Sequence, residues 1–246
     1  MAANKFIFIG GLHRSGTSIL FKCLRDHPEI SGFKDTGVPE DEGQHLQNLY
    51  PTAKEHGGPG RFGFDSKVFL DENSPLVSPQ NAEALFSTWQ QYWDTNKSLL
   101  LEKSPPNLVR GRFLQALFPN SYFIMLLRHP VAVAFATQKW SKTPLEQLLR
   151  HWFVCHKQMR KDIPYLRNSL VLRYEDFIAE PEKNLQLIYQ FVGVDSQPLT
   201  QEIHTKINDK YFSNWHELKL NNKLSYYHLW LKYQYAAKKF GYSLSV

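Results

Sequence analysis

The order of apolar and polar stretches along the chain predicts four strands. Residues 6–9 form a short apolar run, and residues 122–127 form a longer one, which is the pattern of a parallel strand buried on both faces. Residues 98–102 and 169–173 also have the length and composition of strands. Helical patterns separate these stretches, and strands that alternate with helices favour one parallel sheet. We therefore expect an α/β protein with three layers, α/β/α, around a central parallel sheet.

Helices are predicted where apolar residues recur at intervals of three and four positions. They are expected at residues 17–27, after the cap Ser78-Pro79, at residues 107–118, after a capping box at residues 143–146, and at residues 182–192. In the aromatic tail after residue 214, Tyr226, Trp230 and Tyr233 share a helical face that should pack into the core. No repeat or linker divides the chain, so residues 1–246 are expected to form one domain, with a long irregular segment at residues 28–80.

The run from Phe6 to Ser18 combines an apolar strand, a glycine-bounded loop and the start of a helix. Gly11 and Gly16 stand five positions apart, which is the glycine spacing of phosphate-binding loops. Such a loop directs backbone N–H groups and the positive end of a helix at an anion. Thr17 follows Gly16 where a nucleotide triphosphatase has lysine, and the cation is instead Arg14, inside the loop. This shift predicts an anion site that is not built for a magnesium–triphosphate.

Composition and charge narrow the class of protein. The chain has 29 Lys and Arg residues against 23 Asp and Glu, a net charge of +6 that favours anionic ligands. The basic residues form no run or motif for nucleic acid. Two cysteines, Cys23 and Cys155, exclude a disulfide scaffold and fit a reducing compartment. Neither a membrane span nor a signal region is evident, so we expect a cytoplasmic protein.

Several motifs in the chain resemble those of the sulfotransferases that use 3′-phosphoadenosine-5′-phosphosulfate (PAPS). Residues 11–18 are similar to the family's loop around the 5′-phosphosulfate, and residues 123–130 to the strand and turn that hold the 3′-phosphate. Residues 102–105 and 172–177 also recur in bacterial and Golgi-type members, and residues 240–242 look like the end of the protein-tyrosine branch. The motifs occur in the expected order and span most of the chain.

The resemblance implies a set of donor-binding residues. It assigns the 5′-phosphosulfate to the loop residues His13, Arg14, Ser15, Gly16, Thr17 and Ser18. It assigns the 3′-phosphate to Arg128, and the family's serine eight positions later is replaced here by Ala136, with Thr137 as a substitute next to it. Lys103 matches a lysine that neutralises charge on the transferring group, so Arg14 and Lys103 are expected to act in catalysis.

The general base is left open among four residues. The resemblance places a carboxylate shortly after the first helix, where the chain has Asp35 in place of glutamate. Glu40, Glu42 and His45 follow in the same acidic segment and are alternatives, because each can accept a proton from an acceptor hydroxyl.

The predicted function is in-line transfer of a sulfuryl group from PAPS to a hydroxyl group, with no metal, because the sulfuryl group carries less charge than a phosphoryl group. The acceptor could be a small molecule, a sugar or a lipid, and residues 28–80 are expected to form a lid on the acceptor side. Two other classes are considered: a phosphate-loop kinase, which the absence of a lysine after Gly16 disfavours, and a non-catalytic anion-binding protein.

Overall fold

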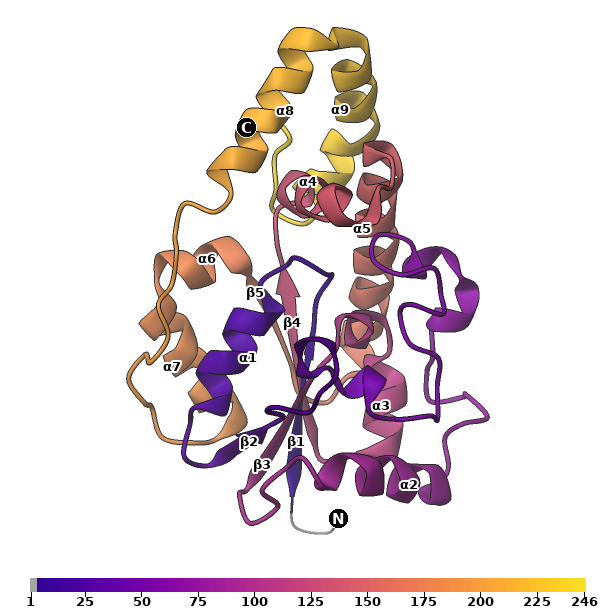
Figure 1. Ribbon diagram of the computed structural model, residues 1–246, viewed down its shortest axis with the longest axis vertical. Helices are drawn as coiled ribbons and strands as arrows, with labels where there is room; N and C mark the ends of the chain where they lie inside the picture. Colours follow the sequence, from indigo (N-terminus) through magenta and orange to yellow (C-terminus); the bar gives the residue numbers. More distant parts are fainter. Residues whose placement is uncertain (1–3) are drawn as a thin grey trace.

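The computed structural model describes residues 4–246. Five strands form one sheet in the order β2-β3-β1-β4-β5, and every neighbouring pair is parallel (Figure 1). The strands are β1 (Lys5–Gly10), β2 (Ile30–Gly32), β3 (Leu99–Lys103), β4 (Ser121–Leu127) and β5 (Ser169–Arg173). The central parallel sheet and four of its strands confirm the sequence prediction.

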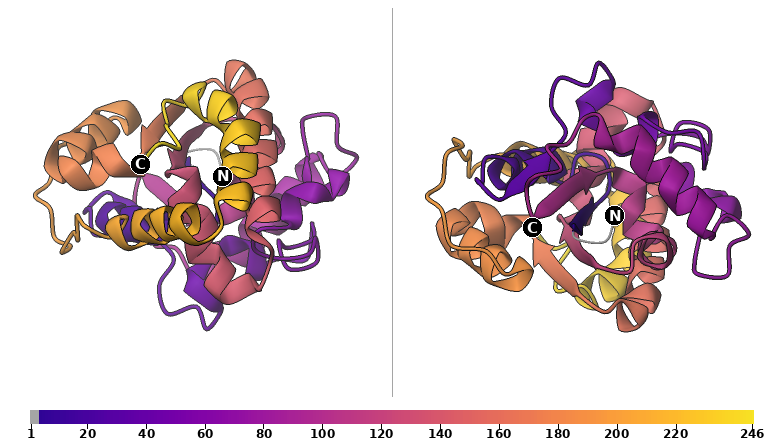
Figure 2. Two further views of the ribbon diagram at one scale, coloured as in Figure 1. Left: turned by 90° about the horizontal axis from the view of Figure 1, so that it is seen from above. Right: turned by 90° about the horizontal axis from the view of Figure 1, so that it is seen from below.

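Helices cover both faces of the sheet, so the predicted three-layer α/β/α fold is confirmed (Figure 2). One face carries α1 (Thr17–Arg25), α6 (Tyr174–Ala179) and α7 (Pro181–Val192), and the other carries α2 (Pro79–Gln90), α3 (Gly111–Leu117) and α5 (Leu145–Asp162). The α2 side holds an aromatic core, in which Phe8 packs against Trp89, Phe118 and Phe123. Burial of these large rings supplies much of the free energy that fixes the sheet.

Three further helices lie beyond the carboxyl edge of the sheet. Helix α4 (Pro130–Ser141) follows β4 directly, and α8 (Asp209–Asn221) and α9 (Lys223–Lys238) form a hairpin at the top of Figure 1. Tyr226 and Tyr233 on α9 are buried, as predicted, whereas Trp230 is half-buried. No helix within residues 4–246 has both the length and the apolar character needed to cross a bilayer.

The irregular segment that follows α1 contains more structure than predicted. It includes the edge strand β2 and four short 3-10 helices: η1 (Pro39–Asp41), η2 (Gly43–His45), η3 (Phe62–Phe64) and η4 (Ser66–Val68). Two others, η5 (Pro105–Val109) and η6 (Ile163–Tyr165), lie elsewhere. Strand β2 is only three residues long, too short to show a hydrophobic period.

Several predicted helix boundaries are wrong. Helix α1 ends at Arg25 and not at residue 27, and the helix expected at residues 107–118 is split into η5 and α3 at Arg110, whose φ of −129° is not helical. The capping box at residues 143–146 does not form, because Pro144 and not Thr143 is the N-cap of α5. The Ser78 cap is confirmed: its hydroxyl accepts a hydrogen bond from the Asn81 N–H at 3.1 Å. Helices α4, α6 and α8 were not predicted.

Candidate active site

The loop between β1 and α1 is held in place by close backbone packing. A Cβ atom on Gly16 would lie 2.3 Å from the ring of Tyr174, and one on Gly10 would lie 2.5 Å from the backbone nitrogen of Leu108. Gly16 has a φ of 93° and caps α1 without a side-chain hydrogen bond. Its conformation suits glycine, and the first-turn N–H groups of α1 are left without a capping side chain. The predicted phosphate-type loop is therefore present in the fold.

A cavity of about 760 Å³ opens beside this loop at the carboxyl edge of the sheet. Its first wall holds the residues assigned to the donor that line it: His13, Arg14, Gly16, Thr17, Ser18 and Arg128. Its second wall comes from the irregular segment and includes Glu40, Glu42, Gln44, His45 and Lys54. Ser15 does not line the cavity; its hydroxyl is buried beneath the loop and has no hydrogen-bond partner. The structure thus brings the loop predicted to bind an anion and the segment that holds three of the candidate bases to one cavity.

Arg128 lies at the end of β4 and is almost completely buried. Its Nε and Nη2 donate to Asn208 Oδ1 at 2.9 and 2.6 Å, and its Nη1 donates to the Arg14 carbonyl at 2.8 Å. The guanidinium also lies over the Tyr174 ring, 4.5 Å from its centroid. Burial lowers the pKa of Arg128, yet its ordinary value is so high that the group keeps its charge. Two of its five N–H groups remain for an anion.

Ala136 and Thr137, eight and nine positions after Arg128, face different surroundings. Ala136 is buried against Ala132 and Tyr211, in a small apolar cluster. Thr137 points the other way, into a small hollow of about 10 Å³ that is also lined by His13 and His151. Its hydroxyl is buried there without a hydrogen-bond partner. Thr137 is therefore not among the residues that line the large cavity with Arg128.

Lys103 and Glu42 form a buried ion pair at the second wall of the cavity. Lys103 Nζ lies 3.1 Å from Glu42 Oε1 and donates to the Glu40 carbonyl at 3.0 Å. The Glu42 side chain also accepts a hydrogen bond of 2.6 Å from Gln44 Nε2 and lies 3.7 Å from His45 Nε2. Glu42 lines the cavity, whereas Lys103 stands directly behind it. The pair places a carboxylate that can accept a proton next to a cation that balances its charge.

A second buried carboxylate, Glu102, fixes the backbone that carries Glu42. Glu102 accepts hydrogen bonds from the Gly43 N–H at 3.0 Å, Ser104 Oγ at 2.5 Å and Asn107 Nδ2 at 2.5 Å. Burial raises the pKa of Glu102 to about 7, against the hydrogen bonds that lower it. Ser104 Oγ accepts from the Gln44 N–H at 3.0 Å, so the end of β3 holds two successive residues after Glu42.

His13 lies between two aromatic side chains on the cavity side of the loop. Its ring centroid is 5.8 Å from those of both Phe62 and Trp140. The protein atoms around the ring lower its pKa to about 3, with Lys103 and His45 as further causes, so His13 is neutral at pH 7 although part of it reaches the cavity. Trp140 is 61% exposed and lines the cavity mouth. His156 on α5 is fully buried.

The structure does not bring Asp35 to the cavity. Asp35 is exposed, has a φ of 53° and is not among the residues that line the cavity. Glu40 reaches the cavity and accepts a hydrogen bond of 2.9 Å from the Ser18 hydroxyl. Both Glu40 and Asp41 have positive φ values, 55° and 50°, a conformation that costs free energy in residues with side chains. This strained turn directs Glu42, and not Asp35, toward the loop.

Sequence analysis missed three residues of the site: Tyr174, Asn208 and Trp140. Tyr174 belongs to the 172–177 motif, which could have identified it. Asn208 and Trp140 carried no signal, because each reaches the site through tertiary packing.

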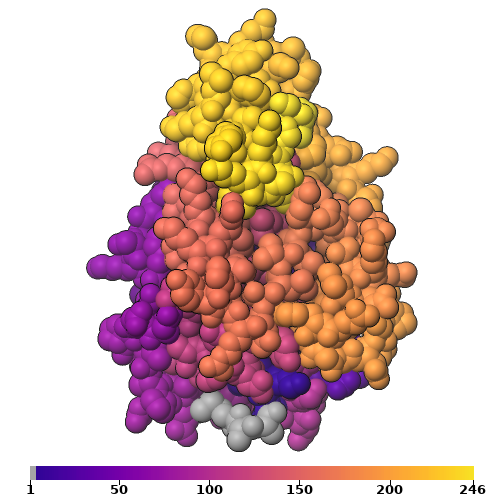
Figure 3. Space-filling model, turned by 180° about the vertical axis from the view of Figure 1, so that it is seen from behind, coloured from indigo at the N-terminus to yellow at the C-terminus, as the bar shows by residue number. Residues whose placement is uncertain are grey.

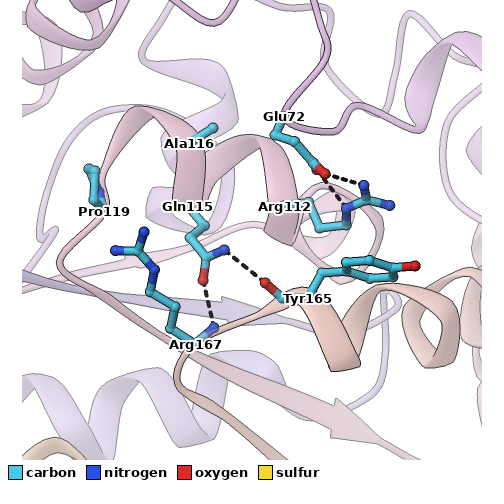
Figure 4. A pocket seen from close by; sticks show the side chains of 7 residues that line it. All are labelled: Glu72, Arg112, Gln115, Ala116, Pro119, Tyr165 and Arg167. Carbon is cyan, nitrogen blue, oxygen red and sulfur yellow. Dashed lines mark hydrogen bonds and ion pairs between the residues drawn. The ribbon is translucent and has the colours of Figure 1, made fainter.

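Another hollow, of about 300 Å³, lies at the opposite edge of the sheet (Figure 4). Pro119 and Arg167 in its lining stand two positions before the first residues of β4 and β5. Its Arg112 is paired with Glu72, and Gln115 bonds the Tyr165 carbonyl and the Arg167 N–H. These polar groups are satisfied by one another, so we place the functional site at the carboxyl edge. Residues 4–246 contain no cluster of three His, Cys, Asp or Glu side chains that could hold a metal ion.

Comparison with known proteins agrees with this architecture. The sequence model described as the sulfotransferase family matches residues 7–198, which is most of the chain. The chain belongs to the sulfotransferase family. The match includes the β1–α1 loop, Lys103 and Arg128, and it ends before the α8–α9 hairpin of this sulfotransferase family member.

Curated relatives are similar at low identity. Protein-tyrosine sulfotransferase 2 of Gallus gallus is 24% identical over 202 residues, which cover 76% of this chain and 51% of the relative. Nodulation protein NoeE of Sinorhizobium fredii is 24% identical over 215 residues, which cover 76% of this chain and 50% of the relative. The chain thus spans about half the length of the curated relatives it matches.

Solved structures share the fold. The sulfotransferase domain from the curacin biosynthetic pathway superposes with a TM-score of 0.55 at 19% identity, covering 87% of this chain and 90% of that one. The sulfotransferase domain from the Synechococcus PCC 7002 olefin synthase gives a TM-score of 0.51 at 23% identity, covering 85% of this chain and 88% of that one. At these identities the likeness supports the sulfotransferase fold alone.

Proposed function

We propose that this protein transfers a sulfuryl group from PAPS to an acceptor hydroxyl. The observation that carries the proposal is the single cavity, in which the β1–α1 loop and Arg128 face Glu42. PAPS carries anionic groups at two ends, and the cavity has a cation for each end. Arg14 and the N-terminus of α1 would bind the 5′-phosphosulfate together with Thr17 and Ser18, and Arg128 would bind the 3′-phosphate.

PAPS would be bound by hydrogen-bond donors that are free or weakly held in this structure. The first-turn N–H groups of α1 lack a side-chain cap, whereas the buried Ser15 hydroxyl does not line the cavity. The Ser18 hydroxyl donates to Glu40 at the surface, so it can exchange that partner for a sulfate oxygen. Thr137 faces the hollow beside His13, so we do not propose that it replaces the serine at the 3′-phosphate.

We propose Glu42 as the general base, in place of Asp35. During transfer, the acceptor oxygen forms a bond to sulfur while the bond from sulfur to the phosphate oxygen breaks. The acceptor proton passes to the Glu42 carboxylate, and adenosine 3′,5′-bisphosphate leaves with the electron pair of the broken bond. Glu42 lines the cavity, and the backbone that follows it is fixed by Glu102 and Ser104. His45, which also lines the cavity 3.7 Å from Glu42, is the second candidate.

Lys103 and His13 would support the reaction through charge and position. Lys103 balances Glu42 and lies close enough to His13 to lower the pKa of that ring. A neutral His13 can donate one hydrogen bond to a sulfate oxygen without adding charge. Fixed donors of this kind stabilise the charge that develops on the transferring group. Arg14 would do the same from the loop.

Two other functions would use the same cavity differently. A phosphate-loop kinase requires a lysine after the second glycine, and Thr17 occupies that position. A non-catalytic anion-binding protein needs no proton acceptor at the cavity, whereas the Lys103–Glu42 pair holds a carboxylate there in spite of the cost of burying two charges. Both observations favour sulfuryl transfer.

The acceptor side of the cavity is formed by residues 39–59, within the segment that we proposed as a lid. Gln44 and Gln47 hold this segment through buried hydrogen bonds to its own backbone, so we propose that it acts as a fixed wall within a single domain. The acceptor would be a small molecule, a sugar or a lipid. The two free, buried cysteines fit a reducing compartment, and we propose a cytoplasmic location.

The experiment combines binding and transfer. Adenosine 3′,5′-bisphosphate should raise the melting temperature in the presence of a chelator, because a ligand that binds only the native state stabilises it. Labelled PAPS offered with a panel of phenols, sugars and lipids should then give a labelled product. Stabilisation by magnesium–ATP, with no effect of the bisphosphate, would refute the proposal.

A further inference from the structure

The α8–α9 hairpin exposes a row of large apolar side chains. Leu224, Tyr227, Leu231 and Tyr235 follow one another along α9 at intervals of three and four residues, so they lie on one face of the helix. They are 88%, 48%, 71% and 72% exposed, and Leu220, at the end of α8, is 62% exposed. We call these five residues the hairpin stripe.

The stripe is separate from the face by which α9 packs onto the protein. That inner face holds Tyr226, Leu229, Tyr233 and Ala237, all of which are buried. Helix α9 therefore has apolar side chains on two sides, of which only one is covered by the protein. Exposed apolar rows of this kind mark sites of interaction.

The charges around the stripe are mostly positive, with Glu217 of α8 and Glu146 of α5 as acidic exceptions. Residues 218–246 contain five lysines and no Asp or Glu. Lys219 and Lys223 flank the leucines at the turn of the hairpin, and Lys238 and Lys239 follow at its other end. Only Lys232 is neutralised by an acid from another element, Glu146 of α5. The partner that fits is therefore apolar and carries negative charge.

The shape of the hairpin distinguishes among possible partners. The hairpin projects from the molecule, and residues of α9 and of the tail after it cover the face of the hairpin that is seen from behind (Figure 3). A stable dimer buries about 800 Å² on each partner, contributed by roughly 20 to 30 residues, whereas the stripe is one row of five side chains on a convex tip. Leucine and tyrosine beside lysine at an exposed tip are the composition of segments that bind at lipid–water interfaces.

We propose that the α8–α9 hairpin binds the surface of an anionic lipid bilayer. The leucines of the stripe would enter the boundary between headgroups and acyl chains, the tyrosine rings would lie at headgroup level, and the lysines would contact anionic headgroups. The proposal does not depend on the reaction in the cavity. Membrane binding would nevertheless bring the cavity close to the lipid. Helix α8 begins next to Asn208, which holds Arg128, and α8 is about 20 Å long, so a bound hairpin places the cavity within about 20 Å of the lipid.

The test is sedimentation of the full chain with vesicles. Vesicles of equal parts phosphatidylcholine and phosphatidylserine should bind the protein, and vesicles of phosphatidylcholine alone should bind it at least tenfold less tightly. Binding should weaken as salt is raised, since salt screens the lysines. The double variant Leu224→Ser/Leu231→Ser should lose at least tenfold in affinity, and so should Lys219→Glu/Lys223→Glu.

Two matched controls show whether the hairpin itself is responsible. Leu187→Ser removes a leucine on α7 that is 45% exposed, and Lys161→Glu reverses an exposed lysine in the last turn of α5. Both should bind anionic vesicles like the unaltered protein. The changed residues are exposed, apart from Lys219, which is half-buried, and circular dichroism spectra of all the variants should match that of the unaltered protein.

Three results would overturn the proposal. The first is no binding of the unaltered protein to the anionic vesicles. The second is equal binding of the hairpin variants and the controls. The third is a dimer in solution that Leu224→Ser/Leu231→Ser converts to monomer, because the stripe would then be covered by a second copy of the chain.

Discussion

Replacing Glu102 by glutamine should remove a specific pH dependence of stability. Burial raises the pKa of this carboxyl from 4.5 to about 7 in the folded protein, so the native state holds the proton more tightly than the unfolded chain does. The stability that follows is fully present below pH 4.5 and is lost as the pH rises to about 7. The difference between the two pKa values corresponds to about 3 kcal/mol. Glutamine has the shape of the protonated acid but cannot lose a proton.

The assay is urea unfolding of both proteins between about pH 5.5 and pH 8. Over this window the unaltered protein should gain about 2 kcal/mol relative to Glu102→Gln as the pH falls. Other titrating groups, including the buried histidines, contribute equally to both proteins and cancel in the difference. Glu83→Gln, at an exposed position on α2, should show no such change. A constant difference between Glu102→Gln and the unaltered protein across this range would refute the reasoning.

Three further substitutions test parts of the site. Gly16→Ala combines a positive φ with a clash against Tyr174, so it should lower the melting temperature. Gly37→Ala should lower it less, because φ is also positive there but no atom lies within 4 Å of the added Cβ. Equal losses of melting temperature would contradict the close packing. Arg128→Ala should weaken binding of adenosine 3′,5′-bisphosphate, measured by calorimetry, by about 2–3 kcal/mol while turnover at saturating donor falls much less. Lys103→Met should lower turnover while donor affinity changes little, because Lys103 contacts Glu42 and not the loop; a large loss of donor affinity would place Lys103 at the donor instead.

The two central strands were predictable because they contain continuous apolar runs. Residues 6–9 of β1 and 123–127 of β4 are all apolar and buried, which is the pattern of strands covered on both faces. The amphipathic helices α5 and α7 were predicted because their apolar residues recur at intervals of three and four positions. Helix α4 was missed because it is buried on most sides at the carboxyl edge, where a helix shows no polar face.

Some site residues could be predicted because their position follows from the order of strands and helices, and others could not. The β1–α1 loop and Arg128 lie at strand ends, so the order of elements alone brings them to one edge of the sheet. The base could not be located this way, because it lies in a segment without periodicity. There, two positive φ values at residues 40 and 41 and the contacts of Glu102 decide that Glu42, and not Asp35, lines the cavity.

The most direct test of the account is turnover of Glu42→Gln with an identified acceptor. A positioned base contributes about 10²–10⁴-fold, so turnover should fall at least about 100-fold. Binding of adenosine 3′,5′-bisphosphate should stay within a factor of about three, which also shows that the variant folds. Asp35→Asn should keep near-normal turnover, since Asp35 is exposed outside the cavity. Near-normal turnover of Glu42→Gln, with a loss in Asp35→Asn or His45→Gln, would contradict the account.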